Sequence, residues 1–140
     1  EAIQEMWRKN LGVEVTLENV EFQVKIDRED KLDYDVARAG WIGDYVDPMT
    51  FLDMWTSNSG QNDARWKNAE FDKLVNIAKT TADRKKRMEA MHKAEDLLMS
   101  EMPVMPIYYY TDLYLIKPTL KDFYGSPLGF KYFMYSYIEE

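Results

Sequence analysis

The chain has 140 residues, which is enough for one domain with a hydrophobic core and too short for two independent ones. Its 25 acidic and 18 basic residues give a net charge of −7, and the sequence has no concentrated basic face for phosphates, so nucleic acid is excluded as a partner. It has no cysteine, which excludes disulfides, thiol catalysis and cysteine-ligated metals.

The first third of the chain predicts alternating helices and strands. Apolar residues at helical spacing precede Gly12, which is typical of a helix that ends at a glycine. Residues 13–19 alternate apolar and polar side chains and predict a strand. A helix is expected over 21–32, with Phe22 and Ile26 inward, and a second strand over 35–42. This order favours an α/β fold in which helices cover a mixed or parallel sheet.

The middle of the chain predicts mainly helices. Pro48 marks the start of a short helix through residue 55, and a polar loop is expected over 56–66. The next helix shows an apolar face formed by Phe71, Leu74, Val75 and Ala78. Asp83 is expected to cap the helix after it, whose inner face carries Met88, Met91, Ala94 and Leu98.

The last part of the chain has a different character. Residues 104–110 read as an aromatic strand, and prolines and glycines then interrupt regular structure from residue 117 onward. Another strand is expected within 132–138. The change in composition places a boundary near Tyr110.

Several enzyme classes can be tested against the residues. One hypothesis takes Asp44 and Asp47 as the paired carboxylates of a hydrolase, but an aspartate directly before Pro48 is typical of a helix N-terminus. Residues 27–35 resemble a calcium loop superficially, without its glycine and closing glutamate. His92, the only histidine, is expected on a helix surface. The sequence therefore favours binding over catalysis.

The stretch "ARAGWIGDY", residues 37–45, carries the strongest sign of a binding site. Arg38 suits a carboxylate, Asp44 suits an ammonium group, and Trp41 offers an apolar wall with a polar edge. Opposite charges along an exposed strand suit a zwitterionic, extended ligand such as a short peptide. The alternative, that Arg38 pairs with a nearby structural aspartate, is equally compatible with these residues.

Three longer stretches resemble a known family. They are "YDVARAGWIGDYVDPMTFLDMWTSNSGQN", "WKNAEFDKLVNIA" and "AEDLLMSEMPVMPIYYY". Together they are similar to the C-terminal portion of the oligopeptide-binding proteins of ABC importers, the family 5 extracellular solute-binding proteins. The resemblance implies a two-lobe clamshell of which this chain is a fragment. Residues 1–110 would belong to the second lobe, and residues 111–140 would cross the hinge and complete the first lobe.

The resemblance also implies roles for individual residues. Asp44 would hold the α-amino group of the peptide, and the backbones of Gly40 and Ile42 would pair with it as an added strand. Arg38 would meet the C-terminal carboxylate of a short peptide. Two aromatic residues would complete the site, with a side-chain pocket lined by Trp41 and the hinge side of the cleft occupied by Tyr110.

The implied function is non-enzymatic delivery of short peptides to an ABC permease, with no cofactor or metal. The expected location is extracytoplasmic, either in the periplasm or lipid-anchored on the outer face of the cell membrane. Exposed strand edges of a fragment are expected to favour self-association. The alternatives are a family member that binds a nickel chelate or a sugar, and a carbohydrate-active hydrolase that uses Asp44 and Asp47.

Overall fold

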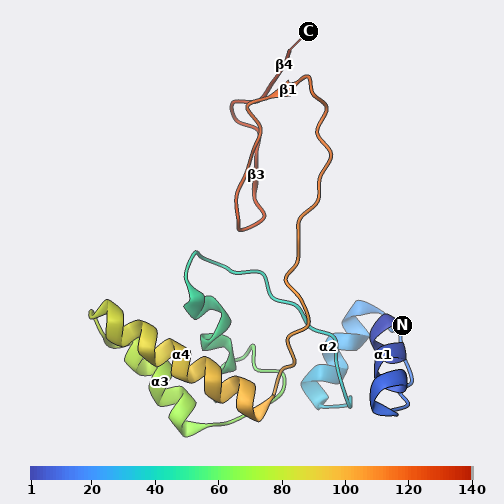
Figure 1. Ribbon diagram of the computed structural model, residues 1–140, viewed down its shortest axis with the longest axis vertical. Helices are drawn as coiled ribbons and strands as arrows, with labels where there is room; N and C mark the ends of the chain where they lie inside the picture. The colour runs from blue at the N-terminus through green and yellow to red at the C-terminus, as the bar shows by residue number, and fades with distance from the viewer. Residues whose placement is uncertain (140) are drawn as a thin grey trace. The chain divides into compact units, whose positions relative to one another are not determined.

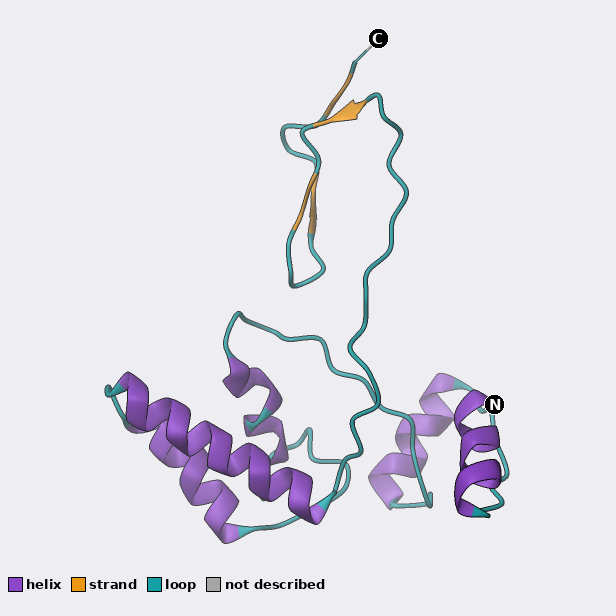
Figure 2. Cartoon of the chain, in the orientation of Figure 1, coloured by secondary structure: helices purple, strands orange, loops and turns teal. Residues whose placement is uncertain are grey.

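The computed structural model describes residues 1–139. The chain divides into two compact units, Glu1–Arg38 and Ala39–Glu140. Figure 1 follows the chain by colour and Figure 2 marks its helices and strands. Helices dominate the first hundred residues, and short strands appear only after residue 119.

The first unit contains two helices, α1 (Ala2–Leu11) and α2 (Phe22–Lys31). As predicted, α1 ends at Gly12, whose φ of 66° is the left-handed conformation that glycine adopts without steric cost. The predicted second helix is confirmed as well, and Glu21 caps it by accepting a hydrogen bond from the Gln23 N–H. The inward face of α2 differs from the predicted one, because Phe22, which was expected to point inward, is 70% exposed.

The second unit begins with an extended segment that leads into two turns of 3₁₀ helix, η1 (Pro48–Phe51) and η2 (Asp53–Trp55). The polar loop predicted over 56–66 follows them. Two longer helices come next, α3 (Ala69–Thr80) and α4 (Arg84–Glu101). Asn68 caps α3 and Asp83 caps α4, each through a side-chain oxygen that accepts backbone N–H groups, so the predicted cap at Asp83 is confirmed.

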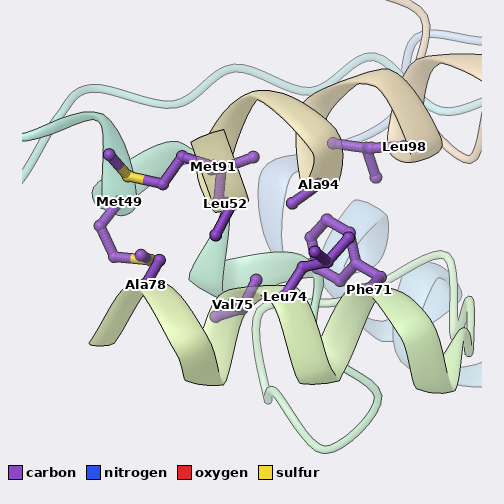
Figure 3. Close-up of a cluster of buried hydrophobic side chains, with 10 residues drawn as sticks. Met49, Leu52, Phe71, Leu74, Val75, Ala78, Met91, Ala94 and Leu98 are labelled. Carbon is purple, nitrogen blue, oxygen red and sulfur yellow. The ribbon is translucent and has the colours of Figure 1, made fainter. Parts of the chain in front are cut away.

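The hydrophobic core of this unit lies between α3, α4 and the 3₁₀ turns (Figure 3). Phe71 is completely buried, and its ring meets Trp66 edge-on at 4.9 Å between ring centroids. The predicted apolar face of α3 is confirmed in full. On α4 three of the four predicted residues are buried, Met88 is only partly buried, and Ala90 joins the core. The core thus holds the 3₁₀ turns against the helix pair.

Four strands of two residues each form two antiparallel ladders near the C-terminus. β1 (Leu120–Lys121) pairs with β4 (Tyr137–Ile138), and β2 (Tyr124–Gly125) pairs with β3 (Lys131–Tyr132). The predicted strand over 132–138 is therefore present as two short strands separated by a turn. Helices and small sheets together make a mixed α and β chain.

The other predicted strands are absent from the described residues. Residues 13–19, 35–42 and 104–110 have no ladder partner within residues 1–139, and the expected parallel sheet is not formed among them. A strand is defined by hydrogen bonds to a neighbouring strand, and alternation of side chains does not supply that neighbour. Within the same residues, no helix combines the length and the apolar character required to cross a membrane.

Candidate functional site

The segment that carries the predicted binding residues is anchored at Asp47. Its carboxylate accepts the N–H of Met49 at 2.9 Å, which starts η1, as the position before Pro48 predicts. The same carboxylate forms a two-bond ion pair with the Arg87 guanidinium, at 2.8 and 2.9 Å. Arg87 also donates from Nε to the Ala78 carbonyl at the end of α3. These contacts tie the start of η1 to both long helices.

Arg87 changes the ionisation of Asp47. Hydrogen bonds from Arg87 and then from the Met49 N–H stabilise the charged carboxylate, which holds the pKa of Asp47 below its ordinary value. The pKa of Arg87 is raised by the same hydrogen bond. A carboxylate held in this way is a structural anion, and it is not available as half of a catalytic pair with Asp44.

Asp44 lies three residues before this anchor and is held by Thr50. The Asp44 N–H donates to Thr50 Oγ1 at 3.1 Å, and the Thr50 hydroxyl donates to Asp44 Oδ2 at 3.3 Å. Thr50 is 2% exposed, whereas Asp44 is exposed. The Asp44 carboxylate therefore lies at the surface, and the Thr50 side chain that holds it is buried.

A hollow of about 430 Å³ opens beside Asp44. Its lining residues come from the extended segment, from η2 and from the following polar loop: Trp41, Asp44, Tyr45, Asp53, Met54, Thr56, Asn58, Ser59 and Gln61. Trp41 is 36% exposed, so part of its ring remains open to a ligand. The lining mixes polar groups with an aromatic wall and contains two carboxylates.

The two carboxylates in the hollow differ in their partners. Asp53 Oδ2 lies 3.2 Å from Lys79 Nζ and accepts the Tyr45 hydroxyl at 3.4 Å. Partial burial, and then the Asp53 carboxylate, raise the pKa of Tyr45 above its ordinary value. Within residues 1–139, Asp44 has no ion pair. Asp44 is therefore the carboxylate in the hollow that lacks a cation.

The loop wall of the hollow is fixed by a buried amide. Asn62 is 2% exposed, and its Nδ2 donates to the Trp66 carbonyl at 2.7 Å and, at longer range, to the carbonyls of Trp55 and Thr56. Its Oδ1 accepts the Trp66 N–H at 3.2 Å. One side chain thus closes the loop onto itself, as buried polar groups require.

The predicted site residues fall into three groups. Trp41 and Asp44 line the same hollow. Gly40 lies beside Tyr110, because a Cβ atom at position 40 would be 3.7 Å from Tyr110 Cε2. Ile42, two residues further on, is 73% exposed. Arg38 is the last residue of the first unit. His92 is exposed on α4, as predicted.

Sequence reasoning missed Thr50, Tyr45, Asp53 and Arg87 as parts of the site. The start of η1 at Pro48 was predicted, and that start alone places Thr50 in the first helical turn, close to the chain before it. No local pattern indicated Arg87, which is 40 residues from Asp47. No group of three or more potential metal-binding side chains occurs among the residues that the structure describes.

Comparison with known proteins defines the class. Residues 1–63 match the family model described as "Bacterial extracellular solute-binding proteins, family 5 Middle". The chain is 45% identical over 140 residues to the oligopeptide-binding protein OppA of Bacillus subtilis, covering 99% of this chain and 26% of the relative. It is 43% identical over 122 residues to the periplasmic murein peptide-binding protein MppA of Escherichia coli, covering 87% and 23%.

Solved structures give the same result. The murein tripeptide binding protein MppA of Escherichia coli aligns with a TM-score of 0.84 and 40% identity, over 99% of this chain and 28% of that one. OppA of Haemophilus influenzae in complex with RPPGFSPFR aligns with a TM-score of 0.79 and 38% identity, over 86% and 24%. The fold is thus that of part of a two-lobe binding protein.

The chain belongs to the family 5 extracellular solute-binding proteins, as the resemblance implied. It spans about a quarter of the length of the curated relatives that it matches.

Proposed function

We propose that this chain forms one face of the peptide site in a two-lobe solute-binding protein, which delivers short peptides to the permease of an ABC importer. The similar proteins support this proposal, since their names describe binders of oligopeptides and murein peptides. The proposed action is reversible binding without turnover, at the outer side of the cell membrane, where relatives named periplasmic are found.

The observation that carries the proposal is the exposed Asp44 carboxylate. It lines an open hollow and has no ion pair within residues 1–139, whereas Asp47 and Asp53 each have a cationic partner. An anion in this position suits a ligand with a free ammonium group, and the α-amino terminus of a peptide is such a group. Trp41, on the same hollow, supplies the wall for a neighbouring side chain.

The remaining predicted residues receive roles in the same proposal. Gly40 and Ile42 lie in extended backbone without a ladder partner among residues 1–139, so their N–H and C=O groups suit an added peptide strand. Arg38 would meet the peptide's carboxylate, and Tyr110 would close the site near the hinge. Residues 1–110 would then belong to the second lobe and residues 111–140 to the first.

The proposal is tested by calorimetry on the complete two-lobe protein with tri- to pentapeptides, free and N-acetylated. Acetylation removes the ammonium charge and should weaken binding to the wild type by about 10–100-fold. This is the change in affinity expected for the loss of one charge-assisted hydrogen bond. Asp44→Asn should bind both peptides equally weakly.

Asp96→Asn is the matched control, because it makes the same change at an exposed aspartate of α4 that does not line the hollow. It should keep the preference for the free amine. Equal affinity of the wild type for free and acetylated peptide would refute the assignment of Asp44.

Self-association is a further part of the proposal. The two small sheets have open edges among the described residues, and the hairpin β2–β3 carries exposed aromatic side chains, including Tyr124 and Tyr132. Exposed edges of this kind pair with other chains. Sedimentation of the 140-residue chain should show concentration-dependent dimers. A monomer at all concentrations would contradict this expectation.

A further inference from the structure

Thr50 is a buried hydroxyl that the proposed ligand contacts do not use. It is 2% exposed and lies in η1, whose start is fixed by the Asp47 cap and by Pro48. The Asp47–Arg87 ion pair holds this turn on the long helices. Thr50 is therefore placed by rigid neighbours rather than by the surface loop that it supports.

Thr50 and Asp44 are joined by two hydrogen bonds although they lie six positions apart in the sequence. Thr50 Oγ1 accepts the Asp44 backbone N–H at 3.1 Å and donates to Asp44 Oδ2 at 3.3 Å. The first bond fixes the backbone of Asp44, and the second fixes the torsion of its carboxylate. Asp44 Oδ1 has no hydrogen bond within residues 1–139 and remains available.

The turn before Asp44 is packed on the same residue. A Cβ built on Gly43 would lie 3.4 Å from Thr50 Cγ2 and 3.4 Å from the Phe51 ring. A side chain at position 43 would therefore contact Thr50 and Phe51, and glycine avoids this contact. The hydrogen bonds to Asp44 come from the Thr50 hydroxyl alone.

We propose that Thr50 is a positioning residue for ligand binding, whose hydroxyl orients the Asp44 carboxylate so that Oδ1 meets the peptide's α-ammonium group. This inference rests on the proposed function. A carboxylate already held in one rotamer loses less side-chain freedom when the ligand arrives, so the free amine binds more tightly.

The test compares Thr50→Val, which keeps the shape and removes the hydroxyl, with Thr50→Ser, which keeps the hydroxyl. Calorimetry on the two-lobe protein gives, for each variant, the ratio of affinities for the free and the N-acetylated peptide. Thr50→Val should reduce this ratio by about 3–10-fold, as expected for one hydrogen bond. Its affinity for the acetylated peptide should be unchanged, and Thr50→Ser should keep the wild-type ratio.

Thr80→Val is the matched control, because it removes an exposed threonine hydroxyl that bonds only within its own helix. It should leave the ratio unchanged. A wild-type ratio for Thr50→Val, or a reduced ratio for Thr50→Ser, would overturn the role of the hydroxyl while leaving Asp44 as the anchor. A wild type that does not distinguish the two peptides would instead overturn the proposed function together with this inference.

A structure of the wild type with bound peptide tests the same point if Thr50→Val does not fold. The Thr50 hydroxyl should remain within hydrogen-bond distance of Asp44 while the other carboxylate oxygen meets the ammonium nitrogen. A carboxylate rotated away from Thr50 in the complex would overturn the inference.

Discussion

Asp47 and Arg87 form a two-bond ion pair, at 2.8 and 2.9 Å, between residues 40 positions apart in the sequence. The pair joins the cap of η1 to the first turn of α4, and Arg87 also reaches the last turn of α3 through the Ala78 carbonyl. Because η1 carries Thr50 and follows Asp44, this ion pair is the structural support of the candidate peptide site.

Removal of Arg87 should destabilise the fold. In Arg87→Ala the Asp47 carboxylate, about one-third exposed, loses its cation and two hydrogen bonds. Charge-assisted bonds of this kind contribute about 1.5–3 kcal/mol, and we expect a loss of that size in the free energy of unfolding. Urea unfolding followed by tryptophan fluorescence measures it.

The control for Arg87→Ala is Arg84→Ala. Arg84 is an exposed arginine in the same first turn of α4. Its removal should change the free energy of unfolding by no more than about 0.5 kcal/mol. Equal effects of the two substitutions would contradict the structural role of the ion pair.

The contribution of Asp47 to stability should depend on pH. Its folded pKa lies below the ordinary aspartate value near 4, so the unfolded chain binds a proton more readily than the folded one. The stabilisation is therefore fully present above about pH 4 and is lost as the pH falls through the lowered folded pKa. Asp47→Asn keeps the helix cap without the charge, so its difference in unfolding free energy from the wild type should disappear on acidification.

The Arg87→Ala background provides the control for this titration. Arg87 is the largest cause of the lowered pKa of Asp47. Without Arg87, the change in unfolding free energy caused by Asp47→Asn should therefore depend much less on pH. The account of Asp47 is wrong if the pH dependence is the same in both backgrounds.

Asn62 should be essential for the loop that lines the hollow. Asn62→Ala leaves the carbonyl and N–H of the partly buried Trp66 without their partner, which costs about 1–3 kcal/mol. Asn58→Ala, which changes an exposed asparagine on the same loop, should cost far less. Hydrogen exchange of the Trp66 N–H gives a local readout. Unchanged protection of this group in Asn62→Ala would contradict the role of Asn62 in closing the loop.

Tyr45 should titrate above an ordinary tyrosine for two separable reasons. Burial is the larger cause and the Asp53 carboxylate the next. Asp53→Asn should therefore lower the pKa of Tyr45 without restoring the ordinary value. The ¹³Cζ chemical shift of Tyr45 reports this titration, and an unchanged or higher pKa in the variant would show that Asp53 does not act on the phenol.

The helices could be predicted from the sequence because their signals are local. Gly12 and Pro48 mark helix ends through their own backbone preferences, Asp83 marks one through its side-chain cap, and the apolar face of α3 follows from spacing alone. The strands over 13–19 and 35–42 were wrong for residues 1–139 because a ladder needs a partner that a strand's own alternation does not encode.

The site was predictable only in part. Asp44 and Trp41 stand out by residue type, and the structure places both on one hollow. The cations that pair with the neighbouring carboxylates could not be predicted in the same way, because Arg87 reaches Asp47, and Lys79 reaches Asp53, from distant helices. The ligand contacts of all six predicted residues stay predictions: Arg38, Gly40, Trp41, Ile42, Asp44 and Tyr110.

The most direct test of the account is the crystal structure of the two-lobe protein with a bound tripeptide. We predict that the peptide's α-amino nitrogen lies about 2.7–2.9 Å from an Asp44 carboxylate oxygen, with the peptide paired as a strand to the backbone of Gly40 and Ile42. A peptide bound in the opposite direction, or an α-amino group far from Asp44, would contradict it.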